Sequence, residues 1–153
     1  MRNFKYLTLG WRPRRTIKFC SWGAEESGLI GSTEWVEENE RALSTKAVTY
    51  INVDVAVAGN YKMVISGSPL LKTMANDQTK NVEDPHLKQS GEKMTMYERM
   101  LESKSGSRKS PDYYDLGSGS DYASFYLFAG KSSHQYTDHY FTGFAYPFLS
   151  FQI

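Results

Sequence analysis

The most strand-like stretch of the chain is AVTYINVDV, residues 47–55. It is rich in β-branched and aromatic residues, which favour the pleated, half-buried surface of a sheet. A shorter run of the same kind, TIKFCSW, occupies residues 16–22 and is bounded by Pro13 and Gly23. These two runs predict two β-strands separated by a segment long enough to hold a helix.

A helix is predicted in that segment. Ser32 has the side chain of an N-cap residue, the glutamates between 34 and 38 bring negative charge to the first turns, and Arg41 brings positive charge near the end. This order of charges suits the helix macrodipole over about residues 33–43. Strand, helix and strand then make a βαβ unit, whose two strands lie parallel in an α/β sheet.

The rest of the chain continues this alternation. A further strand is expected at residues 61–66, and helices are expected at 70–82, 94–103 and 120–128. The polar segment SKSGSRKSPD, residues 103–112, is rich in helix and strand breakers and is expected to be a surface loop. The predicted class is therefore α/β, without internal repeats.

Composition narrows the class of protein. With 153 residues, 40% of them hydrophobic and 14% aromatic, the chain can bury a core and is not of the disordered type. Eighteen basic and seventeen acidic side chains leave a net charge of +1, which gives no reason to expect a nucleic acid or a membrane surface as partner. No apolar run approaches the ~20 residues of a transmembrane helix. Cys20 is the one cysteine, so no intrachain disulfide can form.

Carboxylates stand at the ends of the first two predicted strands. Glu25 and Glu26 follow the first strand, and Asp54 ends the second. Ligands of open α/β sheets bind beyond the carboxyl ends of the strands, so these three side chains are expected to converge in one cleft. One glutamate of such a pair can bind Zn²⁺ while the other acts as general base toward a metal-bound water. By spacing alone, a solvated loop and a turn-forming aspartate explain the same residues.

Several short motifs favour the metal-site interpretation. They occur in order and at matching spacing as GWRPRRT (10–16), FCSWGAEE (19–26), GLIGSTEW (28–35), YINVD (50–54) and LGSGSDY (116–122). Together they resemble the glutamate carboxypeptidase II family, which comprises the N-acetylated-alpha-linked acidic dipeptidases and their intestinal dipeptidyl-peptidase-like relatives. The resemblance spans roughly residues 10–147.

The resemblance implies a fold, an activity and a setting. The fold would be the zinc-aminopeptidase-like three-layer sandwich with a mixed, mainly parallel sheet, and residues 1–153 would be a partial peptidase domain that lacks upstream and downstream parts. The activity would be zinc-dependent exopeptidase hydrolysis of terminal peptide bonds, with two Zn²⁺ ions and a peptide or dipeptide substrate. A homodimer on the extracellular face of the plasma membrane is implied by the resemblance alone.

The resemblance implies roles for individual residues of this chain, according to their positions in the matched motifs. Glu25 resembles the family's general base, Glu26 a ligand of one zinc, and Asp54 a ligand of the other. Glu34 and Glu37 match a structural calcium site, although an acidic, solvated helix turn explains them equally well. Four further positions match the family's substrate-binding residues: Gly28, Leu29, Gly119 and Ser120.

The chain also departs from the family pattern. The first zinc-binding histidine and the bridging aspartate would precede Met1, and Ser150 stands where the second histidine is expected. His134 and His139 lie nearby in sequence and are candidates to replace it, although a surface position suits each better. Residues 130–136 hold no arginine, so a preference for acidic side chains is not implied. We therefore expect an incomplete, inactive site.

Two other interpretations compete with an enzyme. The chain could be a non-catalytic binding or dimerisation module similar to transferrin receptor, or a truncated product without independent function. The retained Glu25, Glu26 and Asp54 favour enzyme ancestry over the first of these. The basic run Arg12–Arg15 has the composition of a nuclear or nucleic-acid signal, but its place before a predicted strand favours a structural role. Cys20 alternates within the same strand and suits the core better than a nucleophile.

Overall fold

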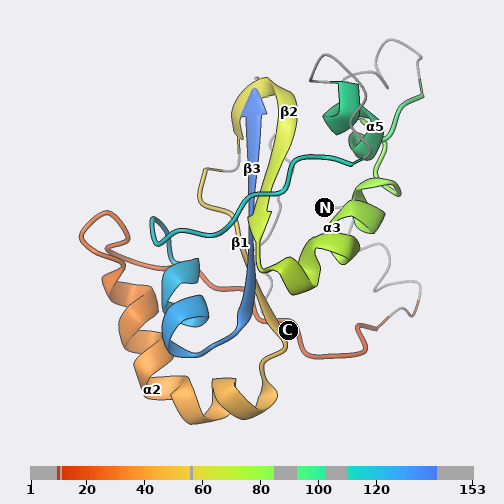
Figure 1. Cartoon of the computed structure of the whole chain (residues 1–153). Coiled ribbons are helices and arrows are strands. Elements are labelled where there is room, and N and C mark those ends of the chain that lie inside the picture. Colours follow the sequence, from red (N-terminus) through yellow and green to blue (C-terminus); the bar gives the residue numbers. More distant parts are fainter. Residues whose placement is uncertain (1–9, 11, 56, 85–92, 103–109, 141–153) are drawn as a thin grey trace.

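The computed structural model describes residues 10, 12–55, 57–84, 93–102 and 110–140 (Figure 1). In chain order its elements are α2 (Ile30–Lys46), β1 (Thr49–Asn52), β2 (Val57–Gly67), the 3₁₀ turn η1 (Pro69–Leu71), α3 (Lys72–Thr79), α5 (Met96–Glu102), the short π-helix η2 (Ser124–Phe128) and β3 (Ser132–Tyr140). None of the helices in these ranges is long and apolar enough to cross a bilayer.

The three strands form one mixed sheet in the order β1-β3-β2. β1 pairs parallel with β3, from Thr49 opposite Ser132 to Asn52 opposite Gln135. β2 runs antiparallel to β3, with irregular pairing near its start. Figure 1 shows β3 between the other strands, with α2 and η2 on one side and α3 and α5 on the other. The α/β class is confirmed, and the described sheet is mixed, with one parallel and one antiparallel pairing.

Two apolar clusters lie among these elements. The first joins α2, β1 and η2, and consists of Val36, Leu43, Tyr50, Tyr122, Ala123 and Phe125. The second joins β2, α3 and α5, and consists of Met63, Ile65, Ala75 and Met100. In the first cluster the rings of Tyr50 and Phe125 stack with their centroids 4.0 Å apart. This stack fixes β1 against the start of the segment that leads into β3.

The helix expected at residues 33–43 is confirmed but longer, and the predicted N-cap is wrong. The helix starts at Ile30, and its N-cap is Leu29, whose backbone is left-handed and whose side chain makes no capping bond. Ser32 is the third helical residue, and its hydroxyl donates to the carbonyl of Leu29 over 3.1 Å. A tight turn before the helix, described below, sets this earlier start.

The first predicted strand is also wrong. Residues 16–22 form no strand in the part of the chain that the structure describes, and of them only Lys18 makes a bridge-type backbone pairing. The parallel partner of β1 is β3 instead. A composition rich in β-branched residues favours an extended backbone. A strand also needs a second strand with which to pair, and composition does not supply one.

The central strand β3 was not predicted. Its sequence, SSHQYTDHY, is polar and has few β-branched residues. The strand expected at 61–66 is found within the longer β2, and the helices expected at 70–82, 94–103 and 120–128 contain α3, α5 and η2. Residues 103–109 of the predicted loop lie outside the described residues.

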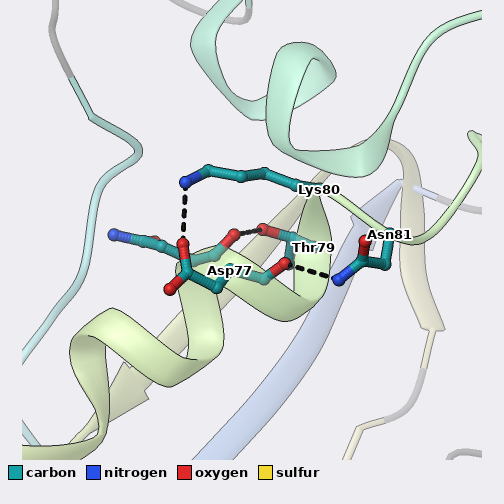
Figure 2. A network of polar contacts seen from close by, with 5 residues as sticks. Asp77, Thr79, Lys80 and Asn81 are labelled. Carbon is teal, nitrogen blue, oxygen red and sulfur yellow. Dashed lines mark hydrogen bonds and ion pairs between the residues drawn. The ribbon is translucent and has the colours of Figure 1, made fainter.

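Figure 2 shows side chains at the end of α3 bonded to one another and to its last carbonyl groups. The ammonium of Lys80 donates to Asp77 over 2.7 Å, and the amide of Asn81 donates to the backbone carbonyl of Asp77 over 3.0 Å. The same ammonium lies 5.0 Å from the ring centroid of Tyr97, which belongs to α5. The carbonyl groups at a helix end need such partners, and these contacts also hold α3 against α5.

Candidate active site

Glu25 and Glu26 lie in a tight turn that leads into α2. The amides of Gly28 and Leu29 both donate to the carbonyl of Glu25, over 3.0 and 2.8 Å. Ala24 and Leu29, on either side of the turn, have positive φ angles of 55° and 59°. Each costs about 1–3 kcal/mol for a residue with a side chain, and such strain clusters at functional sites. The turn therefore holds Glu25 in a fixed place against an energetic cost.

Close contact between two glycines locks this turn onto the helix. The amide of Gly31 donates to the carbonyl of Gly23 over 3.1 Å. A Cβ atom at Gly31 would lie 2.6 Å from that carbonyl oxygen and 3.0 Å from the amide nitrogen of Gly23. Glycine is thus required at position 31, and this contact explains why α2 begins before the expected N-cap.

Several other carboxylates act on the pKa of Glu25 through their charge. Glu25 is half-buried, whereas Glu26 and Asp54 are exposed. Partial loss of solvent raises the pKa of Glu25, and the negative charges of Asp54, Glu26 and Asp121 raise it further. The convergence of Glu25, Glu26 and Asp54 in one metal-binding cleft stays a prediction. The roles assigned to the three residues stay predictions.

Asp121 joins this cluster, although the sequence analysis did not select it. Its side chain is 9% exposed, and one oxygen, Oδ1, has no hydrogen-bond partner among the residues that the structure describes. Burial raises the pKa of Asp121, the nearby hydroxyl of Ser32 lowers it, and the charge of Asp54 raises it again. The available signal was its place in the motif LGSGSDY, which was interpreted as a turn before a helix.

A chain of buried hydrogen bonds connects the three segments of the site. The indole of Trp22 donates to the hydroxyl of Tyr50 over 3.0 Å, and that hydroxyl donates to Oδ1 of Asn52 over 3.0 Å. The amide Nδ2 of Asn52 then donates to the hydroxyl of Ser120 over 2.9 Å. Trp22 precedes the glutamate turn, Asn52 precedes Asp54 by two residues, and Ser120 precedes Asp121 directly. The four side chains thus tie together the segments that carry the acidic groups.

The predicted substrate-binding residues lie in two loops. Gly28 is exposed with a φ of 106°, and Leu29 packs against the first apolar cluster. Gly119 is exposed with open space around its Cα, so a ligand could approach its backbone. The side chain of Ser120 is buried and bonded to Asn52, so only its backbone could reach a substrate. The turn interpretation of this loop also holds, because the amide of Ala123 donates to the carbonyl of Ser120.

Among the residues that the structure describes, the donors near Glu25 do not complete a zinc site. Within the described ranges, no three side chains of the histidine, cysteine, aspartate and glutamate types come close enough to hold one ion. Catalytic zinc normally needs three protein ligands and a water. Only the backbones of His134 and His139 are described, both in β3, and Ser150 lies outside the described residues. Neither histidine can be assigned to the site from this geometry.

The predicted calcium ligands lie away from this turn. Glu34 and Glu37 are both exposed on α2, three residues and so about one helical turn apart. Neither forms an ion pair among the contacts that the structure describes, as is usual for a solvated helix surface. The calcium site stays a prediction.

Comparison with known proteins places the chain in a family. A family model described as Peptidase family M28 matches residues 1–141. The chain is 47% identical over 122 residues to the probable glutamate carboxypeptidase LAMP1 of Arabidopsis thaliana. The matched region is 79% of this chain and 17% of that protein. It is 43% identical over 129 residues to the aminopeptidase NAALADL1 of Rattus norvegicus, covering 80% of this chain and 16% of the relative.

A third relative covers more of the chain. The glutamate carboxypeptidase 2 homolog of Caenorhabditis elegans is 38% identical over 143 residues, which is 90% of this chain and 18% of that protein. The chain thus spans less than a fifth of the length of each of these three relatives. The family match and the identities agree with the resemblance inferred from the motifs. The chain belongs to peptidase family M28.

Proposed function

We propose that this chain supplies part of the active site of a zinc-dependent exopeptidase domain that hydrolyses terminal peptide bonds. One observation carries the proposal: Glu25, in a strained turn, is coupled to the carboxylates of Glu26, Asp54 and Asp121. Relatives named as glutamate carboxypeptidases and as an aminopeptidase support peptide hydrolysis. The same carboxylates argue against a non-catalytic, transferrin-receptor-like module, which would have no need of them.

Glu25 is the proposed general base. A general base works best when its pKa is close to the working pH, and enzymes raise glutamate pKa values by burial and by nearby negative charge. Both causes act on Glu25. In this role Glu25 would accept a proton from the attacking water and later return it to the leaving amine.

Glu26 and Asp54 are the proposed metal ligands, one for each of two zinc ions. Because the described donors do not complete a zinc site, we propose that this chain by itself holds no pair of zinc ions and is inactive. Carboxylates alone bind hard cations such as Ca²⁺ and Mn²⁺ and give zinc no preferred ligand set. The three-layer sandwich, the calcium ligands Glu34 and Glu37, a homodimer and an extracellular location are proposed from the resemblance.

Calorimetric zinc titration and hydrolysis assays on acidic and neutral dipeptides test this proposal. The purified chain is expected to show no tight, stoichiometric zinc binding and no turnover above background. Weak Mn²⁺ binding is expected in its place, and Asp54→Asn should weaken it several-fold. Asp115→Asn removes the same charge from an exposed position outside the cluster and serves as the matched control.

Two results would contradict the proposal in different ways. Tight zinc binding together with turnover that Glu25→Gln abolishes would show that His134, His139 or a second chain completes the site, so inactivity would be wrong. Mn²⁺ binding that is equally weakened by Asp54→Asn and Asp115→Asn would show that no shared carboxylate site exists. The first result would leave Glu25 as the proposed general base. The second would show that Asp54 does not belong to a metal-binding site.

A further inference from the structure

A second site candidate lies along the C-terminal part of α2. An open groove of about 470 Å³ runs between this part of the helix and the segment that precedes Cys20. Its lining includes Arg14, Arg15, Lys18, Trp35, Asn39 and Lys46. None of these residues is acidic, and four of them are basic. The groove is therefore a local concentration of positive charge on a chain whose net charge is only +1.

The four basic side chains are available to a ligand. Arg14, Arg15, Lys18 and Lys46 are all exposed. No ion pair joins any of them to a carboxylate within the ranges that the structure describes. Two guanidinium groups can each form paired hydrogen bonds with a phosphate or a carboxylate, and the two ammonium groups add point charge. The groove thus offers hydrogen-bond donors and positive charge without an internal counter-ion.

The floor of the groove is apolar and fixed in place. Trp35 is half-buried, and its ring packs against Trp22 and Phe125 at centroid distances of 5.4 and 6.0 Å. The ammonium of Lys18 lies 5.4 Å from the centroid of the Trp35 ring, which positions that charge over the groove. The amide of Asn39 donates to the carbonyl of Trp35 over 2.9 Å and holds a further polar group at the wall.

The groove is separate from the carboxylate cluster. The glutamate turn precedes Ile30, the first residue of α2, whereas Lys46 is the last residue of that helix. Sixteen residues at a rise of 1.5 Å put the two ends about 24 Å apart. Of the four cations that line the groove, Lys46 ends α2 and the other three lie within residues 14–18, whereas Glu25 and Glu26 lie in the turn before the helix. A ligand of the groove would not be the peptide bond that the proposed peptidase cleaves.

We propose that this groove binds a small, multiply charged oxyanion, meaning one molecule that carries two or more phosphate or carboxylate groups. The volume falls in the range of small-molecule sites, about 300–1,000 Å³. Four cations around one groove favour a ligand with several negative charges over a single carboxylate. A long polyanion such as nucleic acid is disfavoured, because the chain as a whole is nearly neutral.

Isothermal titration calorimetry of the whole chain tests the proposal. Inorganic pyrophosphate and citrate are used as separate ligands, so that binding through phosphate groups is distinguished from binding through carboxylate groups. Arg14→Gln/Arg15→Gln removes both guanidinium groups, which are exposed, so the fold should be unchanged in circular dichroism. Arg41→Gln/Lys93→Gln changes the net charge equally at exposed positions outside the groove. The groove variant should bind at least about tenfold more weakly, because it loses the charged hydrogen bonds of two guanidinium groups. The control variant should bind within about twofold of the original chain.

The NMR signal of the Trp35 indole N–H supplies a second readout, because Lys18 sits over that ring. It should shift on titration in the original chain and not in the groove variant. Binding of pyrophosphate alone would identify phosphate as the preferred group, and binding of citrate alone would identify carboxylate. Absence of binding to both probes, or equal weakening in the groove and control variants, would overturn the proposal. Should the double variant unfold, Lys46→Gln is measured by the same criteria.

Discussion

At the scale of single residues, strain and close contact define the site. Glu25 sits between Ala24 and Leu29, which both have left-handed backbones, and the turn is pinned by the contact of Gly31 with Gly23. The turn depends on backbone conformation and backbone contacts, which a sequence pattern does not reveal. The site is nonetheless sensitive to single substitutions, because the backbone leaves little room for adjustment.

Gly31→Ala is expected to destabilise the chain by about 1–3 kcal/mol, the usual cost of forcing atoms into a filled space. The new Cβ would lie 2.6 Å from the carbonyl oxygen of Gly23, and backbone atoms cannot move aside as a side chain can. Urea-induced unfolding, followed by circular dichroism, measures the change. Gly23→Ala is the matched control, because a Cβ at that position meets no atom within 4 Å. Equal effects in the two variants would rule out the close contact as the cause.

The raised pKa of Glu25 predicts a pH-dependent effect of Glu25→Gln. The folded chain holds the proton of Glu25 more tightly than the unfolded chain does, so ionisation lowers the free energy of unfolding. This loss begins as pH rises past the ordinary glutamate pKa and is complete above the raised pKa of the folded state. Glu25→Gln should therefore stabilise the chain at pH 7 and have little effect near pH 3, below the ordinary value of about 4.3. Unfolding in urea at both pH values measures this, and destabilisation at pH 7 would contradict it.

At the scale of elements, buried polar bonds connect segments that the sequence keeps far apart. The hydrogen bonds from Trp22 through Tyr50 and Asn52 to Ser120 join the turn before α2, the strand β1 and the loop before η2. Fully satisfied polar networks in a core make its arrangement more specific. Here the network determines how the acidic segments face one another.

Tyr50→Phe should destabilise the chain by about 1–3 kcal/mol, because it leaves the indole N–H of Trp22 and Oδ1 of Asn52 without their partner. Phenylalanine keeps the stack on Phe125, so the loss reports the hydroxyl alone. Tyr126→Phe is a suitable control, since no hydrogen bond of the Tyr126 hydroxyl occurs among the described contacts. Thermal and urea unfolding give the two values. A loss that is no larger for Tyr50 than for Tyr126 would show that the network does not stabilise the fold.

At the scale of the whole molecule, large apolar side chains remain in contact with solvent. Leu70 is 83% exposed, Phe128 65%, and both Phe19 and Leu127 58%. Single exposed apolar residues are normal on a protein surface, but Leu127 and Phe128 are adjacent and belong to the same short helix. Their apolar area would be removed from water by association.

Self-association is therefore expected for the purified chain. Sedimentation velocity should show species larger than the monomer, in a proportion that rises with protein concentration. Leu127→Ser/Phe128→Ser should shift the distribution toward monomer, because it removes apolar area from the surface. The exposed Thr45→Ser exchange on α2 supplies a polar-for-polar control. A monodisperse, cooperatively melting monomer would contradict this prediction and would favour an autonomous module.

Sequence alone was sufficient for what depends on neighbouring residues and on matched motifs. The helix across residues 33–43, strands within 47–55 and 61–66, the α/β class and the family were all inferred correctly, because periodicity, β-branched content and short signatures are local properties. The convergence of Glu25, Glu26 and Asp54 stays a prediction, because the first of the two strands on which it was based is not formed in the described structure.

Only the tertiary structure decided which segments lie side by side. β3 is the central strand although its sequence is polar, because it gains its stability from hydrogen bonds to β1 and β2. Residues 16–22 have strand-like composition but form no strand in the described structure. The helix start at Ile30, the buried Asp121 and the bond between Asn52 and Ser120 depend on contacts between residues distant in sequence. Pairing, close packing and burial are properties of the folded chain, and no local pattern encodes them.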